Sequence, residues 1–191
     1  MTCNPAIHHR RSIRLKDYDY RQAGAYFVTI CTRGQECLFG EIVNGEMICN
    51  EMGMIVQVEW EKTAAIRSEI ELDEFVVMPN HFHGIIWIVD DCWGTAPGRG
   101  TARRAPTDHA PIHEQFGKPV AGSIPTIVRA FKSAVTRHIN IARNTPGVPV
   151  WQRNYYEHII RNEKSYLKIA QYIRNNPTQW ELDNLYPGDK R

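Results

Sequence analysis

Two histidines stand one residue apart in an otherwise apolar run, VVMPNHFHGIIWIV, at residues 76–89. If this run forms a strand, His81 and His83 point to one face of the sheet, and Phe82 points to the opposite face, into the core. Two imidazoles on the same face can both reach one divalent ion, so the pair is a candidate metal site. An HxH pair also occurs on the wet face of a half-exposed sheet, and the motif alone does not decide between the two.

A tyrosine and an asparagine lie one turn apart in the last predicted helix, EKSYLKIAQYIRN at residues 163–175, which Pro177 ends. At about 100° per residue, Tyr172 lies roughly a third of a turn from the apolar stripe of this helix. That stripe consists of Tyr166, Ile169, Ala170 and Ile173. Tyr172 and Asn176, at positions i and i+4, share a face, so the phenol and the amide oxygen can meet one metal centre. An amphipathic tyrosine at a helix edge is the ordinary alternative.

Strands and helices must position these residues, and the sequence predicts where they lie. Runs rich in β-branched and aromatic residues predict strands at 25–32, 71–78, 81–89 and 154–161. The dipeptide NG between two short apolar runs predicts a hairpin within 38–50. Helical spacing predicts helices at 51–68, 123–143 and 163–175, the second with Ser123 as N-cap. This order predicts an α+β fold in which helices pack on an antiparallel sheet.

Length and composition set the broad class. At 191 residues and 42% hydrophobic, the chain is long enough for one core, and we expect a single domain over residues 1–191. Residues 93–122 are dense in Gly, Pro, Ala and Arg without periodicity, which predicts a flexible loop insertion. No apolar run is long enough for a membrane span and the N-terminus lacks an apolar signal core, so we expect a cytoplasmic protein without a membrane partner.

The net charge of +2 is small, but the charges are segregated along the chain. Basic residues gather near the start, in the segment 99–104 and in the helix 123–143, whereas acidic residues concentrate in 59–74. A chain with such segregation can present one basic face to a polyanion such as a nucleic acid. An ordinary solvated surface explains the same pattern equally well.

Taken together, four segments resemble a known family. They are VVMPNHFHGIIWI, FKS, WQRNYYEHIIRNEKSYLKIAQYIRNNP and RRSIRLKDYDYRQAGAYFVTICT. These segments closely resemble the single-tyrosine HUH transposases, specifically the REP-associated tyrosine transposases. HUH denotes His, hydrophobic, His, which is met by His81, Phe82 and His83. The resemblance covers residues 10 to 180 apart from 93–122, and HxH after MPN with a downstream YIxxNP is far more specific than HxH alone.

The resemblance implies a fold, a metal site and a reaction. The fold is that of HUH endonucleases, which is ferredoxin-like or RRM-like. His81 and His83 would bind Mg²⁺ or Mn²⁺, with Asn176 as a third ligand and Tyr172 as the nucleophile. Attack on single-stranded or hairpin, REP-like DNA would form a 5′-phosphotyrosine link and free a 3′-hydroxyl. Two imidazoles and one amide fill only part of the coordination shell of a cation, which leaves positions for phosphate oxygens. These ligands do not determine whether the metal is Mg²⁺ or Mn²⁺.

Four basic residues are candidates for contacts with DNA phosphates. Arg10, Arg11 and Arg14 lie in a basic N-terminal arm over about residues 1–20, and Lys132 lies in the helix 123–143.

Two other functions stay open at this point, a DNA-binding protein that does not cleave and a metal-dependent hydrolytic nuclease. A pure binder need not keep Tyr172 and both histidines, and a hydrolase lacks nearby acidic ligands in the sequence. The sequence leaves open the DNA sequence recognised and the choice between monomer and homodimer. It also leaves open whether Tyr172 serves its own subunit or a partner's, and whether this copy is mobile or domesticated.

Overall fold

The computed structural model describes residues 15, 18–89 and 120–188 of the chain. A four-stranded antiparallel sheet with the order β4-β5-β1-β6 forms its centre. Its strands are β1 (Gly24–Cys31), β4 (Ile70–Met78), β5 (His81–Ile88) and β6 (Tyr156–Ile160). A separate hairpin consists of β2 (Gly40–Val43) and β3 (Glu46–Cys49). The predicted α+β class with an antiparallel sheet is therefore confirmed.

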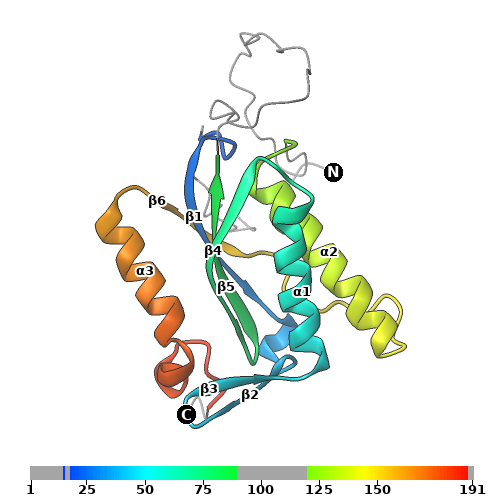
Figure 1. The fold of residues 1–191 in the computed structure, drawn as a ribbon. Helices are drawn as coiled ribbons and strands as arrows, with labels where there is room; N and C mark the ends of the chain where they lie inside the picture. Colours follow the sequence, from blue (N-terminus) through cyan, green and yellow to red (C-terminus); the bar gives the residue numbers. More distant parts are fainter. Residues whose placement is uncertain (1–14, 16–17, 90–119, 189–191) are drawn as a thin grey trace, which may run out of the picture.

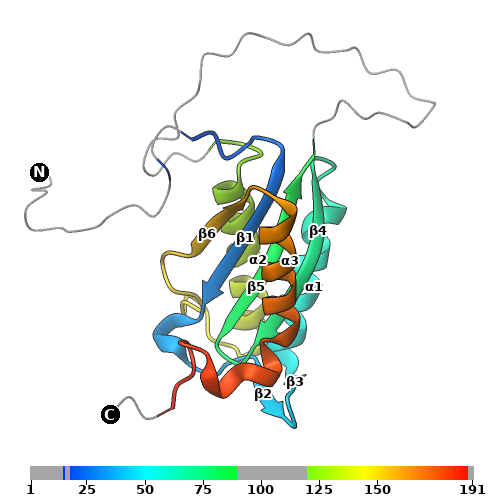
Figure 2. The ribbon, with the colours of Figure 1, turned by 90° about the vertical axis from the view of Figure 1, so that its left-hand side faces the viewer.

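Helices cover both faces of the sheet. The helices α1 (Glu51–Ala65) and α2 (Ile124–Ala142) lie on one face, and α3 (Glu163–Asn175) lies alone on the other (Figures 1 and 2). The larger core joins the sheet to α1 and α2 through Trp60, Phe82 and Phe131, which are almost fully buried. A smaller core joins the opposite face to α3 through Ala170 and Ile173. Each face thus buries its own apolar layer, and α3 is held to the sheet by the smaller one.

Local sequence signals explain where most elements begin and end. Asn44 and Gly45 both have positive φ at the turn between β2 and β3, as the predicted hairpin requires. Asn162 caps α3, since its side-chain oxygen accepts a hydrogen bond from the Ser165 amide. Ser123 stands at the N-cap of α2, but its hydroxyl donates to the Val120 carbonyl and does not cap the helix.

The turn at Pro79 and Asn80 separates β4 from β5, and Met78 pairs directly with His81. The two runs on either side of PN are therefore neighbouring antiparallel strands. Gly84, in the middle of β5, allows α1 to pack closely, because a Cβ there would lie 2.6 Å from the Trp60 ring. This close packing fixes β5 against α1 and leaves its other face to carry the histidines.

Some predictions fall on parts of the chain that the structure does not describe. The arm with Arg10, Arg11 and Arg14 lies outside the described residues, as does the loop insertion except for 120–122. The single domain over 1–191 stays a prediction. Within residues 15, 18–89 and 120–188, no helix has the length and apolar composition needed to cross a membrane.

Candidate active site

The two histidines lie at the start of β5, on the face of the sheet that α3 covers. His81 and His83 are 0% and 2% exposed, so they are buried and do not lie on a wet surface. The ring of His83 stacks on Phe27 of β1, and the ring of His81 lies beside Trp180. Trp180 belongs to η2 (Pro177–Leu182), the short 3-10 helix that follows α3. The chain after Pro177 therefore closes over the histidine pair.

Hydrogen bonds at Nδ1 fix the orientation of each imidazole ring and therefore which nitrogen faces the site. The Asn80 amide nitrogen donates to the carbonyls of Gln35 and Leu185, so its oxygen faces His81 Nδ1 at 2.8 Å. This arrangement assigns the proton of His81 to Nδ1 and leaves a lone pair on Nε2. The Thr29 hydroxyl lies 2.8 Å from Nδ1 of His83 in the same way, so Nε2 of His83 faces the centre of the site.

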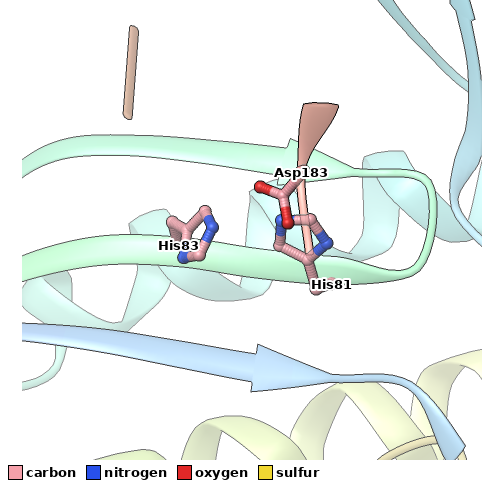
Figure 3. A group of neighbouring side chains, drawn as sticks. All are labelled: His81, His83 and Asp183. Atoms are coloured by element: carbon pink, nitrogen blue, oxygen red, sulfur yellow. The ribbon is translucent and has the colours of Figure 1, made fainter. Parts of the chain in front are cut away.

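Tyr172, Asn176 and Asp183 complete the group around the histidines. The Tyr172 hydroxyl lies 3.2 Å from His83 Nε2 and donates to Asp183 Oδ2 at 3.1 Å. The Asn176 amide nitrogen donates to the same carboxylate oxygen at 3.0 Å. Asp183 follows η2 directly, and Figure 3 shows its carboxylate beside the two imidazoles. The predicted helix face with Tyr172 and Asn176 thus points at the histidines of the same chain.

The donor atoms fit a divalent cation. Ligand atoms of His81, His83 and Asp183 all lie within 4.8 Å of one another. His81 Nε2 and Asn176 Oδ1 are both buried and have no hydrogen-bond partner, so two acceptors in this group remain unsatisfied. Imidazole nitrogens with a carboxylate oxygen form a set that binds Mn²⁺ or Mg²⁺. The structure thus adds the Asp183 carboxylate, as a further possible ligand, to the two histidines and one amide expected from the sequence.

Burial controls the protonation of these groups. Burial lowers the pKa of His81 to about 4, although the charge of Asp183 and the Asn176 amide oppose this shift. Burial also lowers the pKa of His83 well below its ordinary value, and the neighbouring His81 adds to the effect. Burial, followed by the charge of Asp183, raises the pKa of Tyr172 to about 12. At neutral pH both imidazoles are therefore neutral and free to bind a cation, while the phenol keeps its proton.

Comparisons with known proteins identify one related chain and a solved structure with the same fold. No protein-family model matches the chain. An uncharacterized protein of Haemophilus influenzae is 48% identical over 185 residues, which cover 96% of each chain. The chain belongs to the same family as this protein. Among solved structures, that of a REP-associated tyrosine transposase bound to a REP hairpin superposes with a TM-score of 0.55 and 19% identity. The superposition covers 85% of this chain and 72% of the other.

The chain has the fold of a REP-associated tyrosine transposase, as the motifs predicted. This fold brings together four of the predicted site residues, namely Tyr172, His81, His83 and Asn176. It places Lys132 on α2, which packs on the other face of the sheet. The Lys132 ammonium donates to the backbone carbonyls of Gln152 and Arg153. Contact of Lys132 with DNA stays a prediction.

The sequence interpretation missed Asp183 and the two residues that orient the histidines, Asn80 and Thr29. The only available signal for Asp183 was an acidic residue shortly after the NP that ends α3. Asn80 stands next to the first histidine, but a turn asparagine has an ordinary structural explanation. Thr29 carried no signal, since its contact with His83 depends on the pairing of β1 with β5.

In this transposase fold a β-bulge also positions the helix that carries Tyr172. The register of β4 shifts between Leu72 and Phe75, and the two bulged residues contact α3. Asp73 accepts a hydrogen bond from Trp87 Nε1 at 2.9 Å, and it lies close enough to the Tyr166 hydroxyl to raise the pKa of that group. Glu74 forms an ion pair with Arg174 at 2.9 Å. Tyr172 lies between the two contacted helix residues, Tyr166 and Arg174, so we expect the bulge to help position it relative to His83.

We expect Asp73→Ala to slow the chemistry attributed to Tyr172 without weakening DNA binding. Loss of the Trp87 and Tyr166 contacts lets α3 shift, and a misplacement of about 1 Å costs roughly tenfold to a hundredfold in rate. Single-turnover rates of adduct formation and dissociation constants for DNA, measured separately, check this. Glu71→Ala, on the same strand before the bulge, is the matched control. An unchanged rate in Asp73→Ala would show that the bulge has no positioning role.

The buried histidines also predict a stability that depends on pH. Because their pKa values are lowered on folding, the unfolded chain binds more protons than the folded protein below about pH 6.5. The free energy of unfolding should therefore be highest above this pH and should fall as the pH drops toward 4. The slope reaches about 1.4 kcal/mol per pH unit for each histidine.

Urea unfolding with chelator present, from about pH 7.5 to about pH 5, measures this slope. His81→Gln, which removes one of the two buried imidazoles, should flatten the curve. Equal slopes in wild type and His81→Gln would contradict the assignment of a neutral buried imidazole.

Proposed function

We propose that this protein is a metal-dependent DNA transesterase of the REP-associated tyrosine transposase type. The observation that carries the proposal is the position of the Tyr172 hydroxyl, 3.2 Å from His83 Nε2 and 3.1 Å from Asp183 Oδ2. A nucleophile of this kind needs a neighbour that takes its proton and a positive charge near the phosphate that it attacks. Both requirements can be met at this one position.

His81, His83 and Asp183 would hold Mg²⁺ or Mn²⁺, with the Asn176 oxygen as a further ligand. When bound, the cation supplies positive charge that polarises the scissile phosphate and stabilises the charge of the transition state. Asp183 accepts the phenolic proton through the hydrogen bond that it already makes to Tyr172. Asn80 and Thr29 keep the imidazoles oriented through their Nδ1 atoms.

The reaction is a phosphoryl transfer without net hydrolysis. The Tyr172 oxygen forms a bond to phosphorus, the bond from phosphorus to the 3′-oxygen breaks, and the released 3′-oxygen takes up a proton. The product is a 5′-phosphotyrosine link and a free 3′-hydroxyl. The link retains the phosphodiester energy, so a second 3′-hydroxyl can reverse the step and rejoin strands.

We infer that the substrate is single-stranded or hairpin, REP-like DNA. The solved structure with the same fold is bound to a REP hairpin, and the folds agree over 85% of this chain. Tyr172 contacts the histidine of its own chain, so one chain can form the whole site. We therefore propose that a homodimer is not required for cleavage.

A metal-dependent hydrolase is the second candidate. Little in the sequence supported it, because no acidic ligand lies close to the histidines along the chain, but Asp183 lies beside them in the fold. A carboxylate beside two imidazoles is a ligand set that hydrolytic metal sites also use. In a hydrolase, water attacks and no DNA remains on the protein.

The test is incubation of the protein with end-labelled single-stranded DNA from its own genomic flanks, with Mn²⁺ or with EDTA. We expect a labelled protein band that survives denaturing electrophoresis and forms only with metal. Cleavage without any such band would support the hydrolase. Binding without cleavage under all conditions would support a DNA-binding protein that does not cut.

A further inference from the structure

A groove lies between α2 and the segment 149–153, outside the site described above. Its volume is about 480 Å³, and it is open to solvent. Lys132 and Arg137 of α2 line one side, and Trp151 and Arg153 line the other. Three of these side chains are cationic, and no acidic residue lines the groove. A groove with this charge fits a polyanion.

The cations of the groove are available to a ligand. Arg137 and Arg153 are exposed, and neither forms a salt bridge with any residue in the described part of the chain. The hydroxyls of Ser133 and Thr136 add neutral donors beside them. Guanidinium groups bind phosphate oxygens through two parallel hydrogen bonds, so a pair of free arginines suits a phosphodiester chain.

Lys132 is held in place at this groove. Its ammonium donates to the carbonyl oxygens of Gln152 at 2.6 Å and Arg153 at 3.2 Å. An ammonium has three donors, so one remains for a ligand. Burial lowers the pKa of Lys132 to about 8, and an anion in the groove would oppose this shift.

The groove is connected to the active site through the end of the sheet. The Gln152 amide donates to the Cys31 carbonyl at 2.9 Å, and Trp151 forms a bridge with Thr32. Cys31 in turn pairs with His81 on β5. Two strand spacings of about 4.8 Å therefore separate the backbone of the segment 151–152 from that of His81, a distance of roughly 10 Å, although the groove lies on the α2 side of the sheet and the histidines lie on the α3 side. At about 3.4 Å per nucleotide in a stacked strand, a strand that passes round the edge of the sheet needs at least roughly three nucleotides to cover this distance.

We propose that this groove binds the phosphodiester backbone of the DNA strand within a few nucleotides of the phosphate that Tyr172 attacks. The inference rests on the proposed function, because it assumes that the scissile phosphate lies at His81 and His83. Arg137 and Arg153 contact phosphates from opposite sides of the groove, and Lys132 contributes the third cation. The contacts are to the backbone, so they orient the strand without reading its sequence.

The test uses Arg137→Ala, Arg153→Ala and the double variant, with Arg143→Ala as the control. Arg143 follows α2 directly but does not line the groove. Dissociation constants for a single-stranded oligonucleotide that carries the cleavage site are measured over a series of salt concentrations. Each groove variant should weaken binding about fivefold and reduce the slope of log K against log salt by about 0.7. Arg143→Ala should change neither quantity by a comparable amount.

Neutral methylphosphonates, placed one at a time along the same oligonucleotide, locate the contacts. The wild type should bind the oligonucleotide more weakly when the methylphosphonate stands at one or two positions within about four nucleotides of the cleaved phosphate. The affinity of the double variant should not change when the methylphosphonate stands at those positions. Equal effects of Arg143→Ala and the groove variants, or sensitivity only at distant positions, would overturn the proposal.

The outcomes separate this inference from the proposed function. If the groove variants bind DNA like the wild type while the wild type still forms a tyrosine adduct, the groove proposal is wrong and the transesterase stands. If the groove variants lose binding but no adduct forms on wild-type protein, the transesterase is wrong and the groove remains a DNA contact. A third outcome is that an acidic peptide competes with DNA for the wild type, and that the groove variants bind this peptide more weakly but bind DNA as well as the wild type does. The groove would then serve a protein partner, and the proposal would be wrong.

Discussion

Replacement of Tyr172 by phenylalanine should abolish the covalent link between protein and DNA. The change removes one oxygen, the atom that lies 3.2 Å from His83 Nε2. Loss of a nucleophile costs about 10⁴-fold or more in rate, so no adduct should accumulate on the time scale of the wild-type reaction. Mass spectrometry of the wild-type adduct should identify a peptide that contains Tyr172 joined to the 5′-phosphate of the cleaved strand.

The same change should leave the fold and DNA binding almost unaffected. The Tyr172 side chain is 41% exposed, and its edge contact with Phe27 does not depend on the hydroxyl. A substitution of this kind changes the free energy of unfolding by about 1 kcal/mol or less. Loss of the adduct with retained binding therefore isolates the chemical step from recognition of the DNA.

Tyr156→Phe is the matched control. Tyr156 lies on β6 and contacts the same Phe27 ring, but it is half-exposed and forms no hydrogen bond to the histidines or Asp183 in the described structure. We expect its adduct yield to equal that of wild type. If Tyr172→Phe still forms an adduct, or if the linked peptide contains Tyr155, Tyr156 or Tyr166, the assignment of the nucleophile is wrong.

Local periodicity explains why the histidines, Tyr172 and Asn176 could be predicted. Strand alternation places His81 and His83 on one face wherever the strand lies, and helical spacing places Asn176 one turn after Tyr172. Burial of Phe82, Ala170 and Ile173 then fixes which face of each element meets the other. The apolar patterns of the strand and of the helix, both visible in the sequence, therefore predict that the histidine pair faces the pair of Tyr172 and Asn176.

Asp183 could not be predicted in the same way, because its place depends on a segment without periodicity. Pro177 ends α3, and η2 then turns the chain back over His81 through Trp180. The conformation of such a turn follows from tertiary packing, and no repeat in the sequence reports it. The orientation of Asn80 likewise depends on the carbonyls of Gln35 and Leu185, which are distant in sequence. Such contacts between distant segments decide whether a charged carboxylate lies beside the neutral histidines and amide of the site.

Removal of either histidine should strongly weaken both metal binding and cleavage. His81→Ala and His83→Ala each delete an imidazole whose Nε2 faces the site, and we expect cleavage to fall by about a hundredfold or more. Calorimetric titration with Mn²⁺ gives a second readout, in which affinity should fall in both variants while DNA binding survives. Asp183→Asn keeps the shape of the side chain but removes its charge, so it should weaken Mn²⁺ binding if the carboxylate is a ligand.

The control for these variants is His158→Ala. His158 lies on β6 and pairs with Phe27, so it stands on the same face of the sheet as His83, but it is exposed and outside the donor cluster. Its loss should change neither Mn²⁺ affinity nor the rate of cleavage, and EDTA should stop cleavage by this variant and by wild type alike. Cleavage at the wild-type rate in both His81→Ala and His83→Ala would exclude the metal role. If Asp183→Asn binds Mn²⁺ normally while the histidine variants bind it weakly, Asp183 is not a metal ligand, and its remaining role would be to accept the proton of Tyr172.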